Sequence, residues 1–492
     1  MALPIALYST AQVRAIDAHA INELKIPGYM LMKRAGEAAL RYLRTRWPMA
    51  HRIVIVCGSG NNGGDGYVLA RFAQAAGLTV TVLAAADPEA LHGDARQAYE
   101  DCRASEGSVK PFAPEQLSFG EVIVDALLGT GLKGSVREEY ASVIRAVNSA
   151  ATPVFALDVP SGLDSDAGTA SGEAIRADAT ITFVGLKTGL FVGDGPEYAG
   201  TVFFDDLELG DAPQLGLSPR LTRIVEAEIH AALPRRARAS NKGDFGRVLI
   251  VGSGSGMPGA ARMAGEASLR VGAGLVTVAV APENVTAIAA GRPELICIGV
   301  KEEGELKDAL DKADVIAVGP GLGRTAWSRA ALDAVLATRK PLVVDADALN
   351  LLAEGAPSAR EEWILTPHPG EAGRLLGMSA QEVQQDRLTA LDRLLDRYHG
   401  TVVLKGAGTL VGAAGRTPGL CERGNPGMAT AGTGDVLTGT IAGILAQSAD
   451  PWAAARVGVL VHAMAGDTAA RGGERGVLAS DLLRELPHCV NL

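Results

Sequence analysis

The feature that most constrains the fold of this chain is an alternation of short β-branched segments with alanine-rich segments, which occurs twice along the sequence. The first series contains five apolar segments of strand length, at residues 52–58, 78–84, 121–128, 153–160 and 179–185. Continuous apolar strands that alternate with helices are typical of a parallel sheet with helices on both faces. Ahead of this series, residues 10–46 predict two helices that separate at Pro27-Gly28 and pack on the sheet.

A second series begins at RVLIVGS and has strand-length segments at residues 247–253, 274–281, 313–320, 341–347, 363–369 and 401–406. The pattern lapses between the two series, where residues 207–219 are loop-like and residues 233–246 are polar and basic. A chain of 492 residues is also too long for one hydrophobic core. We therefore predict an α/β protein of two domains, residues 1–220 and 221–492, which share a fold class without an obvious repeat.

The charge and the cysteines exclude several classes of protein. The net charge of −10 argues against a broad nucleic-acid-binding surface, which is normally basic. Five scattered cysteines without a CxxC pair indicate a reducing compartment and argue against a disulfide framework or a zinc site. No segment approaches the roughly 18 apolar residues that span a bilayer, and the first residues lack the basic region of a signal peptide. We expect a cytoplasmic protein that binds neither nucleic acid nor a membrane.

A glycine-rich segment, CGSGNNGGDG at residues 57–66, joins the first predicted strand to a helix. Glycines permit positive φ and close approach of a ligand, and the start of a helix offers free N–H groups to an anion. At the carboxyl end of a strand, this arrangement indicates a phosphate-binding loop. The alternative is a tight turn, but a plain turn does not require the side chains of Asn61, Asn62 and Asp65.

Two further strand ends carry polar chemistry. Asp125 is followed by GTGLKGS at residues 129–135, and Asp158 is followed by PSG at residues 160–162. For either aspartate alone, a helix cap or a loop hydrogen bond is an open alternative. Because the carboxyl ends of parallel strands meet at one edge of a sheet, three such ends predict a shared ligand cleft.

Together, the segments NNGGDG, DALLGTG and LDVPSG resemble the NAD(P)H-hydrate epimerase family over about residues 10–215. The resemblance implies a Rossmann-like three-layer α/β/α sandwich that interconverts the R and S epimers of hydrated NADH and NADPH. It implies that Asp158 is the acid/base beside the nicotinamide ring and that Asn62, Asp125 and Ser161 hold a potassium ion. The residues implied to hold the phosphates and ribose are Asn61, Asn62, Gly63, Gly64, Asp65, Gly129, Thr130, Gly131, Leu132, Lys133, Gly134 and Ser135. Lys133 is an alternative proton donor, although contact with phosphate is its expected role.

The strongest single signal is AGTGD at residues 431–435, which opens a long alanine- and glycine-rich helical segment. The N–H groups at the start of such a helix form an anion site. Asp435 lies inside that site, where a carboxylate accepts a proton from a hydroxyl that attacks a phosphoryl group. The alternative is a helix-capping aspartate. The sequence contains no Walker loop of the form GxxxxGK[ST].

AGTGD resembles the GTGD pattern of the ribokinase superfamily. From about residue 225 onward, six further segments resemble the ADP- or ATP-dependent NAD(P)H-hydrate dehydratases of that superfamily: NKGDFG, GSGSGMPGAA, GPGLG, DADALN, TPHPGE and VVLKGAGT. The resemblance implies a ribokinase-like α/β/α domain in which Gly321, His368 and Asp435 contact the hydrated nucleotide and His368 to Glu371 shape the ring pocket. The residues implied to bind ADP or ATP, with Mg²⁺ bridging its phosphates, are Lys405, Gly406, Ala407, Gly408, Thr409, Gly424, Asn425, Gly427, Met428, Gly432, Thr433 and Gly434.

The two resemblances imply a bifunctional metabolite-repair enzyme that acts on NADHX and NADPHX, the hydrates of NADH and NADPH. Asp435 would deprotonate the C6 hydroxyl, the hydroxyl would be phosphorylated, and loss of phosphate would regenerate NAD(P)H. Family resemblance also implies a homo-oligomer. Two alternatives remain: a vitamin or sugar kinase of the ribokinase type, and an N-terminal domain that only binds a partner. The sequence leaves open the choice between ADP and ATP, the preferred hydrate, and any transfer of substrate between the two sites.

Overall fold

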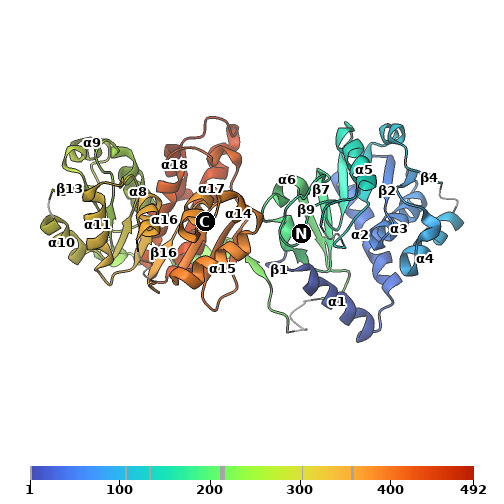
Figure 1. The fold of residues 1–492 in the computed structure, drawn as a ribbon, viewed down its shortest axis with the longest axis horizontal. Coiled ribbons are helices and arrows are strands. Elements are labelled where there is room, and N and C mark those ends of the chain that lie inside the picture. The colour runs from blue at the N-terminus through green and yellow to red at the C-terminus, as the bar shows by residue number, and fades with distance from the viewer. Residues whose placement is uncertain are drawn as a thin grey trace. The chain divides into compact units, whose positions relative to one another are not determined.

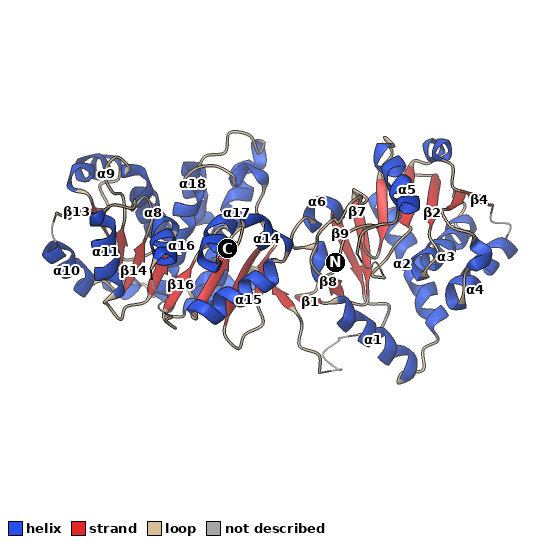
Figure 2. Cartoon of the chain, in the orientation of Figure 1, coloured by secondary structure: helices blue, strands red, loops and turns tan. Residues whose placement is uncertain are grey.

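The computed structural model describes residues 3–105, 108–131, 134–210, 216–301, 303–355 and 359–491. The chain divides into two compact units, Met1–Leu221 and Thr222–Leu492. In each unit, strands and helices alternate along the chain and the helices lie around a central sheet (Figure 1 and Figure 2). The predicted α/β class is confirmed, and each unit is described separately.

The N-terminal unit contains a seven-stranded sheet whose neighbouring strands are all parallel, in the order β4-β3-β2-β5-β6-β7-β9. Its strands are β2 (Arg52–Cys57), β3 (Thr79–Ala84), β4 (Val109–Pro111), β5 (Val122–Ala126), β6 (Val154–Leu157), β7 (Ala179–Phe183) and β9 (Thr201–Asp205). A short parallel pair joins β1 (Ala6–Tyr8) to β8 (Leu186–Lys187). The strand order reverses direction between β2 and β5, and open sheets of this kind bind ligands at the carboxyl ends beside such a reversal.

Helices cover both faces of this sheet. They are α1 (Thr10–Asn22), α2 (Gly28–Arg46), α3 (Asn61–Ala75), α4 (Gly93–Ala104), α5 (Glu138–Ser149) and the short α6 (Gly195–Ala199). On one face, α1 to α4 pack on Ile55 and Val124, while on the other face α5 packs on Val54 and Ile123. Because successive residues of a strand point to opposite faces, this alternation produces the three-layer sandwich. Helices α1 and α2 separate at the predicted Pro27-Gly28 position.

The glycine-rich segment after β2 differs from its predicted form. Residues 61–66 form the first turns of α3 rather than a loop, and no glycine within residues 57–66 has a positive φ. A Cβ at Gly63 would overlap the backbone of Gly58, and a Cβ at Gly66 would crowd Cys57 and Ala126. These two glycines are therefore required by the close packing of α3 against β2 and β5, and the prediction that they supply unusual backbone conformations is wrong.

The C-terminal unit contains ten strands in the order β13-β12-β11-β14-β15-β16-β17-β18-β19-β10. They are β10 (Leu221–Arg223), β11 (Arg247–Val251), β12 (Leu275–Val280), β13 (Ile296–Gly299), β14 (Val315–Val318), β15 (Leu342–Val344), β16 (Trp363–Leu365), β17 (Thr401–Leu404), β18 (Thr409–Ala413) and β19 (Gly419–Cys421). Strands β11 to β17 pair in parallel, as predicted, whereas β18 pairs antiparallel with both β17 and β19. The strand order reverses direction between β11 and β14, so the segments after these strands flank a second potential ligand crevice.

Helices of the described residues surround this sheet: α7 (Ala227–Ala232), α8 (Pro258–Arg270), α9 (Val285–Gly291), α10 (Glu303–Lys312), α11 (Ala326–Leu336), α12 (Ala346–Glu354), α13 (Pro369–Leu376), α14 (Ala380–Gln385), α15 (Arg387–Tyr398), α16 (Thr433–Ser448), α17 (Pro451–Ala469) and α18 (Ala479–Cys489). A core of small and β-branched side chains joins α8, α16, α17 and α18 to one face of the sheet. The chain moves in one direction from β11 to β12 and in the other from β14 to β15. Since crossovers between parallel strands are right-handed as a rule, α8 and α11 lie on opposite faces of the sheet, and α11 has no residue in the core that includes α8. This arrangement gives a second α/β/α unit.

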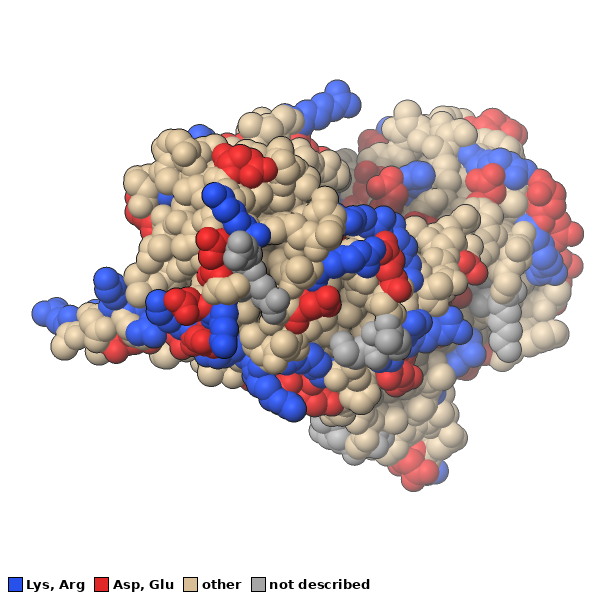
Figure 3. All heavy atoms as spheres, turned by 60° about the vertical axis from the view of Figure 1, so that its left-hand side comes forward, with Lys and Arg blue, Asp and Glu red and all other residues tan. Residues whose placement is uncertain are grey.

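The surface carries charges of both signs. Acidic and basic side chains are interspersed over the face drawn in Figure 3, and the chain as a whole has a net charge of −10. Among the helices that the structure describes, none combines the length and the apolar character needed to cross a bilayer.

Replacing Gly439 by alanine tests the close contact between α16 and α8. A Cβ at Gly439 would overlap the carbonyl oxygen of Ala264, so the two helices would have to separate. We expect Gly439→Ala to lower the free energy of unfolding by about 1–3 kcal/mol, measured as a lower thermal-unfolding midpoint. Gly259→Ala on α8 is the control, because a Cβ there meets nothing within 4 Å. Equal midpoints for the two variants would contradict the packing argument.

Candidate active sites

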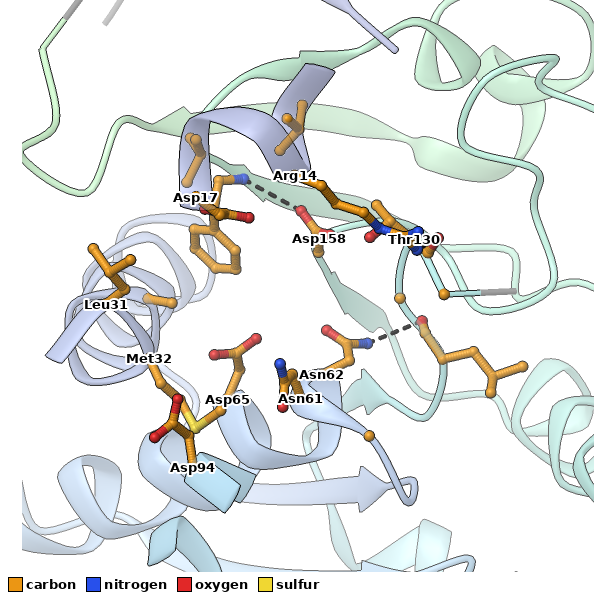
Figure 4. A pocket seen from close by; sticks show the side chains of 18 of the residues that line it. Arg14, Asp17, Leu31, Met32, Asn61, Asn62, Asp65, Asp94, Thr130 and Asp158 are labelled. Atoms are coloured by element: carbon orange, nitrogen blue, oxygen red, sulfur yellow. Dashed lines mark hydrogen bonds between the residues drawn. The ribbon is translucent and has the colours of Figure 1, made fainter. Parts of the chain in front are cut away.

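A cavity of about 750 Å³ lies in the N-terminal unit, at the carboxyl ends of β2, β5 and β6. Its walls come from the segments that follow these strands, from α1 and α2, and from the first turns of α3 (Figure 4). The cavity therefore occupies the crevice beside the reversal of strand order, and its volume is within the usual range for sites that bind small molecules.

Asp158 and Lys187 form a buried ion pair in this cavity. Asp158 follows β6 directly and has a φ of 65°, in the left-handed region that few residues other than glycine, asparagine and aspartate adopt. The ammonium group of Lys187 donates to the Asp158 carboxylate and, at 2.7 Å, to the carbonyl oxygen of Phe183. The Lys187 side chain is only 1% exposed. A buried ammonium requires a counter-charge, which the Asp158 carboxylate supplies.

Two further carboxyl groups line the same cavity. Asp17 lies on α1 and Asp65 lies in the second turn of α3, and Figure 4 shows both side chains directed toward the space that Asp158 faces. Burial raises the pKa of Asp17 to about 6; Lys187 opposes this shift and Asp158 adds to it. Burial also raises the pKa of Asp65 well above its ordinary value, and Asp158 and Asp17 add to the shift. At neutral pH the cavity therefore contains both neutral and ionised carboxyl groups.

Asn62 and Ser161 both contact the backbone of Leu128, and Asp125 joins this cluster through Ser161. The hydroxyl of Ser161 donates to Asp125 at 2.6 Å and accepts from the N–H of Leu128 at 2.8 Å. The amide nitrogen of Asn62 donates to the carbonyl oxygen of Leu128 at 3.0 Å (Figure 4). Among the residues that the structure describes, the buried amide oxygen of Asn62 has no hydrogen-bond partner. A buried, unpartnered oxygen near a carboxylate is suited to a cation.

The structure places only some of the predicted substrate-binding residues at the cavity. Those that line it are Asn61, Asn62, Asp65, Gly129, Thr130, Gly131, Ser135 and Asp158. Gly63 and Gly64 instead face Gly58 and Met32, and Gly134 is not among the lining residues. Leu132 and Lys133 lie outside the residues that the structure describes.

Arg14, Asp17 and Lys187 are three of the five charged residues of the cavity that were not predicted; the other two are Asp94 and Arg137. Arg14 on α1 donates to the carbonyl oxygen of Thr130 at 2.8 Å and so links α1 to the segment after β5. None of the three lies in a glycine-rich segment, and all three reach the cavity only through tertiary packing. The one local signal is a lysine directly after an apolar strand, in TITFVGLKTG.

In the C-terminal unit, predicted site residues gather where β14, β16 and β17 end. Gly321 follows β14, His368 follows β16, and Lys405 follows β17 directly. Asp435 lies in the first turn of α16, which brings it to the same edge. There its carboxyl group interacts electrostatically with Lys405. Gly321 has a φ of 57°, a conformation that favours glycine.

Lys405 is the centre of a buried charge network. Its ammonium group donates to Asp345 at 2.7 Å and lies 3.6 Å from Glu371. Asp345, which follows β15, also accepts from the hydroxyl of Thr438 at 2.6 Å. Burial opposes ionisation of Asp345, but the Lys405 ammonium holds its pKa below the usual value. Burial also disfavours the charge on Lys405, but Asp345 and Glu371 raise its pKa. The network therefore fixes a positive charge beside the start of α16.

Asp435 is the third residue of α16, and no hydrogen bond links its side chain to the residues that the structure describes. The cap position is Gly432, which has a φ of 90°. The structure thus gives no support to the alternative of a capping aspartate. Burial raises the pKa of Asp435 to about 7, with Asp345 adding to the shift and Lys405 opposing it. A carboxyl group that titrates near neutral pH is suited to general-base catalysis.

His368 has a structural role as well as its predicted position after the end of a strand. It is the N-cap of α13, where its Nδ1 accepts from the N–H of Gly370 at 2.9 Å. Its Nε2 lies 3.4 Å from Glu371, and half of its side chain is exposed. Burial lowers the pKa of His368 below its ordinary value. The capping bond fixes the orientation of the ring while leaving one edge accessible.

The two predicted nucleotide-binding segments are shaped by residues that sequence analysis missed. Arg387 on α15 is almost fully buried and donates to the carbonyl oxygens of Leu404 and Gly408. It holds a segment in which Gly406 has a φ of 140°, a backbone conformation suited to glycine. Arg387 carries no local motif, so only the tertiary structure reveals this role.

The segment before α16 is held by Asp467 on α17. Asp467 accepts from the Asn425 amide at 3.0 Å and from the N–H of Gly424 at 3.2 Å. The Asn425 oxygen accepts in turn from the N–H of Gly427 at 3.0 Å, and Met428 packs against the core. The side chains of Asn425 and Met428 therefore stabilise the segment. A ligand would contact the backbone of the segment rather than these side chains.

Two family models match the chain, one in each unit. The model described as NAD(P)H-hydrate dehydratase matches residues 248–488, and the model described as YjeF-related protein N-terminus matches residues 28–189. Relatives named bifunctional NAD(P)H-hydrate repair enzyme Nnr span both units. The one from Coxiella burnetii is 50% identical over 488 residues, which cover 99% of each chain. The one from Escherichia coli is 43% identical over 495 residues and covers 100% of this chain and 95% of its own.

A solved structure supports the fold of the C-terminal unit. A ribokinase-like superfamily protein from Enterococcus faecalis matches with a TM-score of 0.52 and 32% identity, over 56% of this chain and 96% of its own. The predicted ribokinase-like fold is therefore confirmed. Because the full-length relatives match across both units, the chain belongs to the family of bifunctional NAD(P)H-hydrate repair enzymes.

Proposed function

We propose that the N-terminal unit epimerises hydrated NADH and NADPH, and that the C-terminal unit converts the S hydrate back to NAD(P)H with ADP or ATP as phosphoryl donor. The observation that carries this proposal is the full-length match to repair enzymes that contain both units. The arrangement of ionisable groups at the carboxyl edge of each sheet supports it. A homo-oligomeric state and a cytoplasmic location remain expectations from the sequence.

In the C-terminal unit, Asp435 accepts the proton of the C6 hydroxyl as that oxygen attacks the terminal phosphoryl group. The peptide N–H groups at the start of α16 and the nearby ammonium of Lys405 stabilise negative charge on the transferred group. Hydroxide is a poor leaving group and phosphate is a good one. Loss of phosphate from C6 with a proton from C5 then restores the carbon–carbon double bond of the dihydronicotinamide.

Mg²⁺ fits this site as a companion of the nucleotide. Within the described part of the chain, no group of three or more His, Cys, Asp or Glu side chains could hold a metal ion. That agrees with the usual behaviour of Mg²⁺, which is bound largely through substrate phosphates and water. Carboxylates at this edge other than the general base Asp435 would supply the remaining oxygen ligands. When bound, the ion would neutralise charge on the phosphates during transfer.

In the N-terminal unit, we assign the acid/base role at C6 to Asp158, whose carboxylate faces the cavity and is oriented by Lys187. The N–H groups at the start of α3 and the segment at residues 129–131 would hold the phosphates and ribose. Ring and phosphates then occupy different parts of one cavity, which suits a dinucleotide-like substrate.

A potassium ion fits the cluster formed by Asn62, Asp125 and Ser161. The unpartnered amide oxygen of Asn62 supports this proposal, because a cation would supply the interaction that this buried oxygen lacks. Asp125 would contribute a carboxylate oxygen, Ser161 its hydroxyl and Leu128 its carbonyl group. The ion would fix the segment after β5 against the start of α3.

Purified R and S hydrates of NADH test the proposed activities. We expect the S hydrate with ADP or ATP to regain the near-ultraviolet absorbance of the dihydronicotinamide, and the R hydrate to follow after epimerisation. Asp435→Asn should lower the kcat of dehydration roughly 10²- to 10⁴-fold while epimerisation, measured by chromatography of the two epimers, is unchanged. A stable phosphoester product without recovery of absorbance would instead identify a kinase.

The dehydration rate should depend on pH through Asp435. Its pKa is raised to about 7, and a general base must be ionised to act. We therefore expect kcat/KM at limiting hydrate to fall about tenfold per pH unit below pH 7 and to reach a plateau above it. The control is epimerisation by the same protein without nucleotide, which does not use Asp435. A pH-independent dehydration rate between pH 5 and pH 8 would contradict this assignment.

Potassium should stabilise the N-terminal unit. At a concentration 100 times its Kd, a ligand of the native state alone adds about 2.7 kcal/mol. We expect a higher thermal-unfolding midpoint in KCl than in tetramethylammonium chloride of equal ionic strength, and a smaller difference in Ser161→Ala. Identical midpoints of the wild-type protein in the two salts would rule out the site.

A further inference from the structure

Four carboxyl groups line the cavity of the N-terminal unit, and three of them, from three different elements, are directed toward a common space. Asp17 comes from α1, Asp65 from α3, and Asp158 from the end of β6 (Figure 4). A site that only holds phosphates and ribose does not need three carboxyl groups, because ionised carboxylates repel phosphate. Their arrangement therefore requires a separate explanation.

The surroundings of Asp158 and Asp65 differ in one decisive respect. Asp158 has the buried ammonium of Lys187 as its partner. For Asp65, no hydrogen bond or ion pair connects its carboxyl group to any residue that the structure describes. The charged groups that act on Asp65 are Asp158 and Asp17, which disfavour its ionisation, and Lys187, which favours it. Together with burial, the balance favours a neutral Asp65 beside an ionised Asp158.

The pKa of Asp17 is raised less than the pKa of Asp65. Burial raises the pKa of Asp17 only to about 6, so this group is mostly ionised at pH 7. Its negative charge then adds to that of Asp158 in keeping the proton on Asp65. Three further charged side chains, Arg14, Asp94 and Arg137, also line the cavity. Of the three carboxyl groups, Asp65 is thus the one suited to donate a proton near neutral pH.

The chemistry of epimerisation requires both an acid and a base. C6 of the hydrate carries a hydroxyl group and is bonded to the ring nitrogen. Its configuration inverts if the hydroxyl leaves as water, assisted by the nitrogen lone pair, and water then adds to the opposite face of the planar iminium ion. Departure is accelerated by a proton donor on one face, and addition by a proton acceptor on the other.

We propose that Asp65 and Asp158 are this acid–base pair, a proposal that rests on the proposed epimerase activity of the unit. Asp65 gives its proton to the C6 hydroxyl, the carbon–oxygen bond breaks, and its electron pair leaves with the water formed. The nitrogen lone pair forms the carbon–nitrogen double bond. A second water then bonds to C6 from the face of Asp158, which takes its proton, while the electron pair returns to nitrogen.

The reverse inversion exchanges the two roles, with Asp158 as donor and Asp65 as acceptor. Because one proton is gained and one is lost, the site carries the same charge before and after each inversion. Proton exchange with solvent resets the pair. Lys187 acts as a positioning residue that stabilises the ionised form of Asp158. In this assignment Asp65 contacts the ring, and the backbone of the α3 start contacts the phosphates.

The first test compares variants in the absence of ADP and ATP. Starting from the pure R hydrate, we expect Asp65→Asn to lower the kcat of epimerisation roughly 10²- to 10⁴-fold with KM changed less than about threefold. The alkaline limb of the wild-type kcat/KM profile should also disappear. Glu37→Gln removes an exposed carboxylate on α2 and serves as the matched control, with wild-type kinetics expected. A wild-type kcat with a raised KM in Asp65→Asn would show that this residue only holds substrate.

The second test needs no variant and therefore does not depend on how Asp65→Asn folds. Epimerisation by the wild-type protein in oxygen-18 water should place one labelled oxygen on C6 per inversion, read by mass spectrometry against an enzyme-free blank. Inversion without label would overturn the acid–base pair while leaving the epimerase function intact. Absence of any inversion above the blank would instead overturn the proposed function itself.

Discussion

Both units depend on the same constraint, which is that a parallel sheet delivers the carboxyl ends of its strands to one edge. Side chains that are distant in sequence, such as Asp125 near the end of β5 and Asp158 directly after β6, come to the same edge because β5 and β6 are adjacent strands. The reversal of strand order then opens a crevice at this edge that helices cannot fill. Helices α3 and α16 begin at the same edge and bring their free N–H groups to it. The backbone alone thus supplies the crevice and the free N–H groups that a phosphate site needs, whatever the side chains are.

At the carboxyl edge of its own sheet, each unit has a similar arrangement of charges. Each buries a lysine against one aspartate, Lys187 with Asp158 and Lys405 with Asp345. Each then places a second carboxyl group nearby, where burial and a neighbouring negative charge raise its pKa: Asp65 in one unit and Asp435 in the other. The units have different strand orders, so the likeness is one of chemistry and not of topology. A fixed ammonium determines which carboxyl group is ionised and leaves its neighbour free to exchange a proton.

The central strands were predictable because apolar β-branched residues fill them on both faces, as in β2 and β11. The edge strand β4 and the antiparallel strands β18 and β19 were not, because they are short and contain proline or glycine. At the sites, the glycine-rich segments indicated where the strands end. The sequence could not reveal Lys187 or Arg387, which act through partners far along the chain. It also suggested a flexible loop at residues 57–66, where the glycines in fact allow a helix to pack against the sheet.

The left-handed backbone at Asp158 has a consequence for how this site can vary. At a φ of 65°, glycine, asparagine and aspartate are accommodated most easily, whereas alanine or glutamate would strain the turn after β6. Most substitutions at this position therefore alter conformation and charge together. Asparagine is the exception, since it keeps the shape and the backbone preference of aspartate while removing the ionisable group. The turn therefore restricts this position to aspartate, asparagine and glycine. This restriction limits how the chemistry of the cavity can change during evolution.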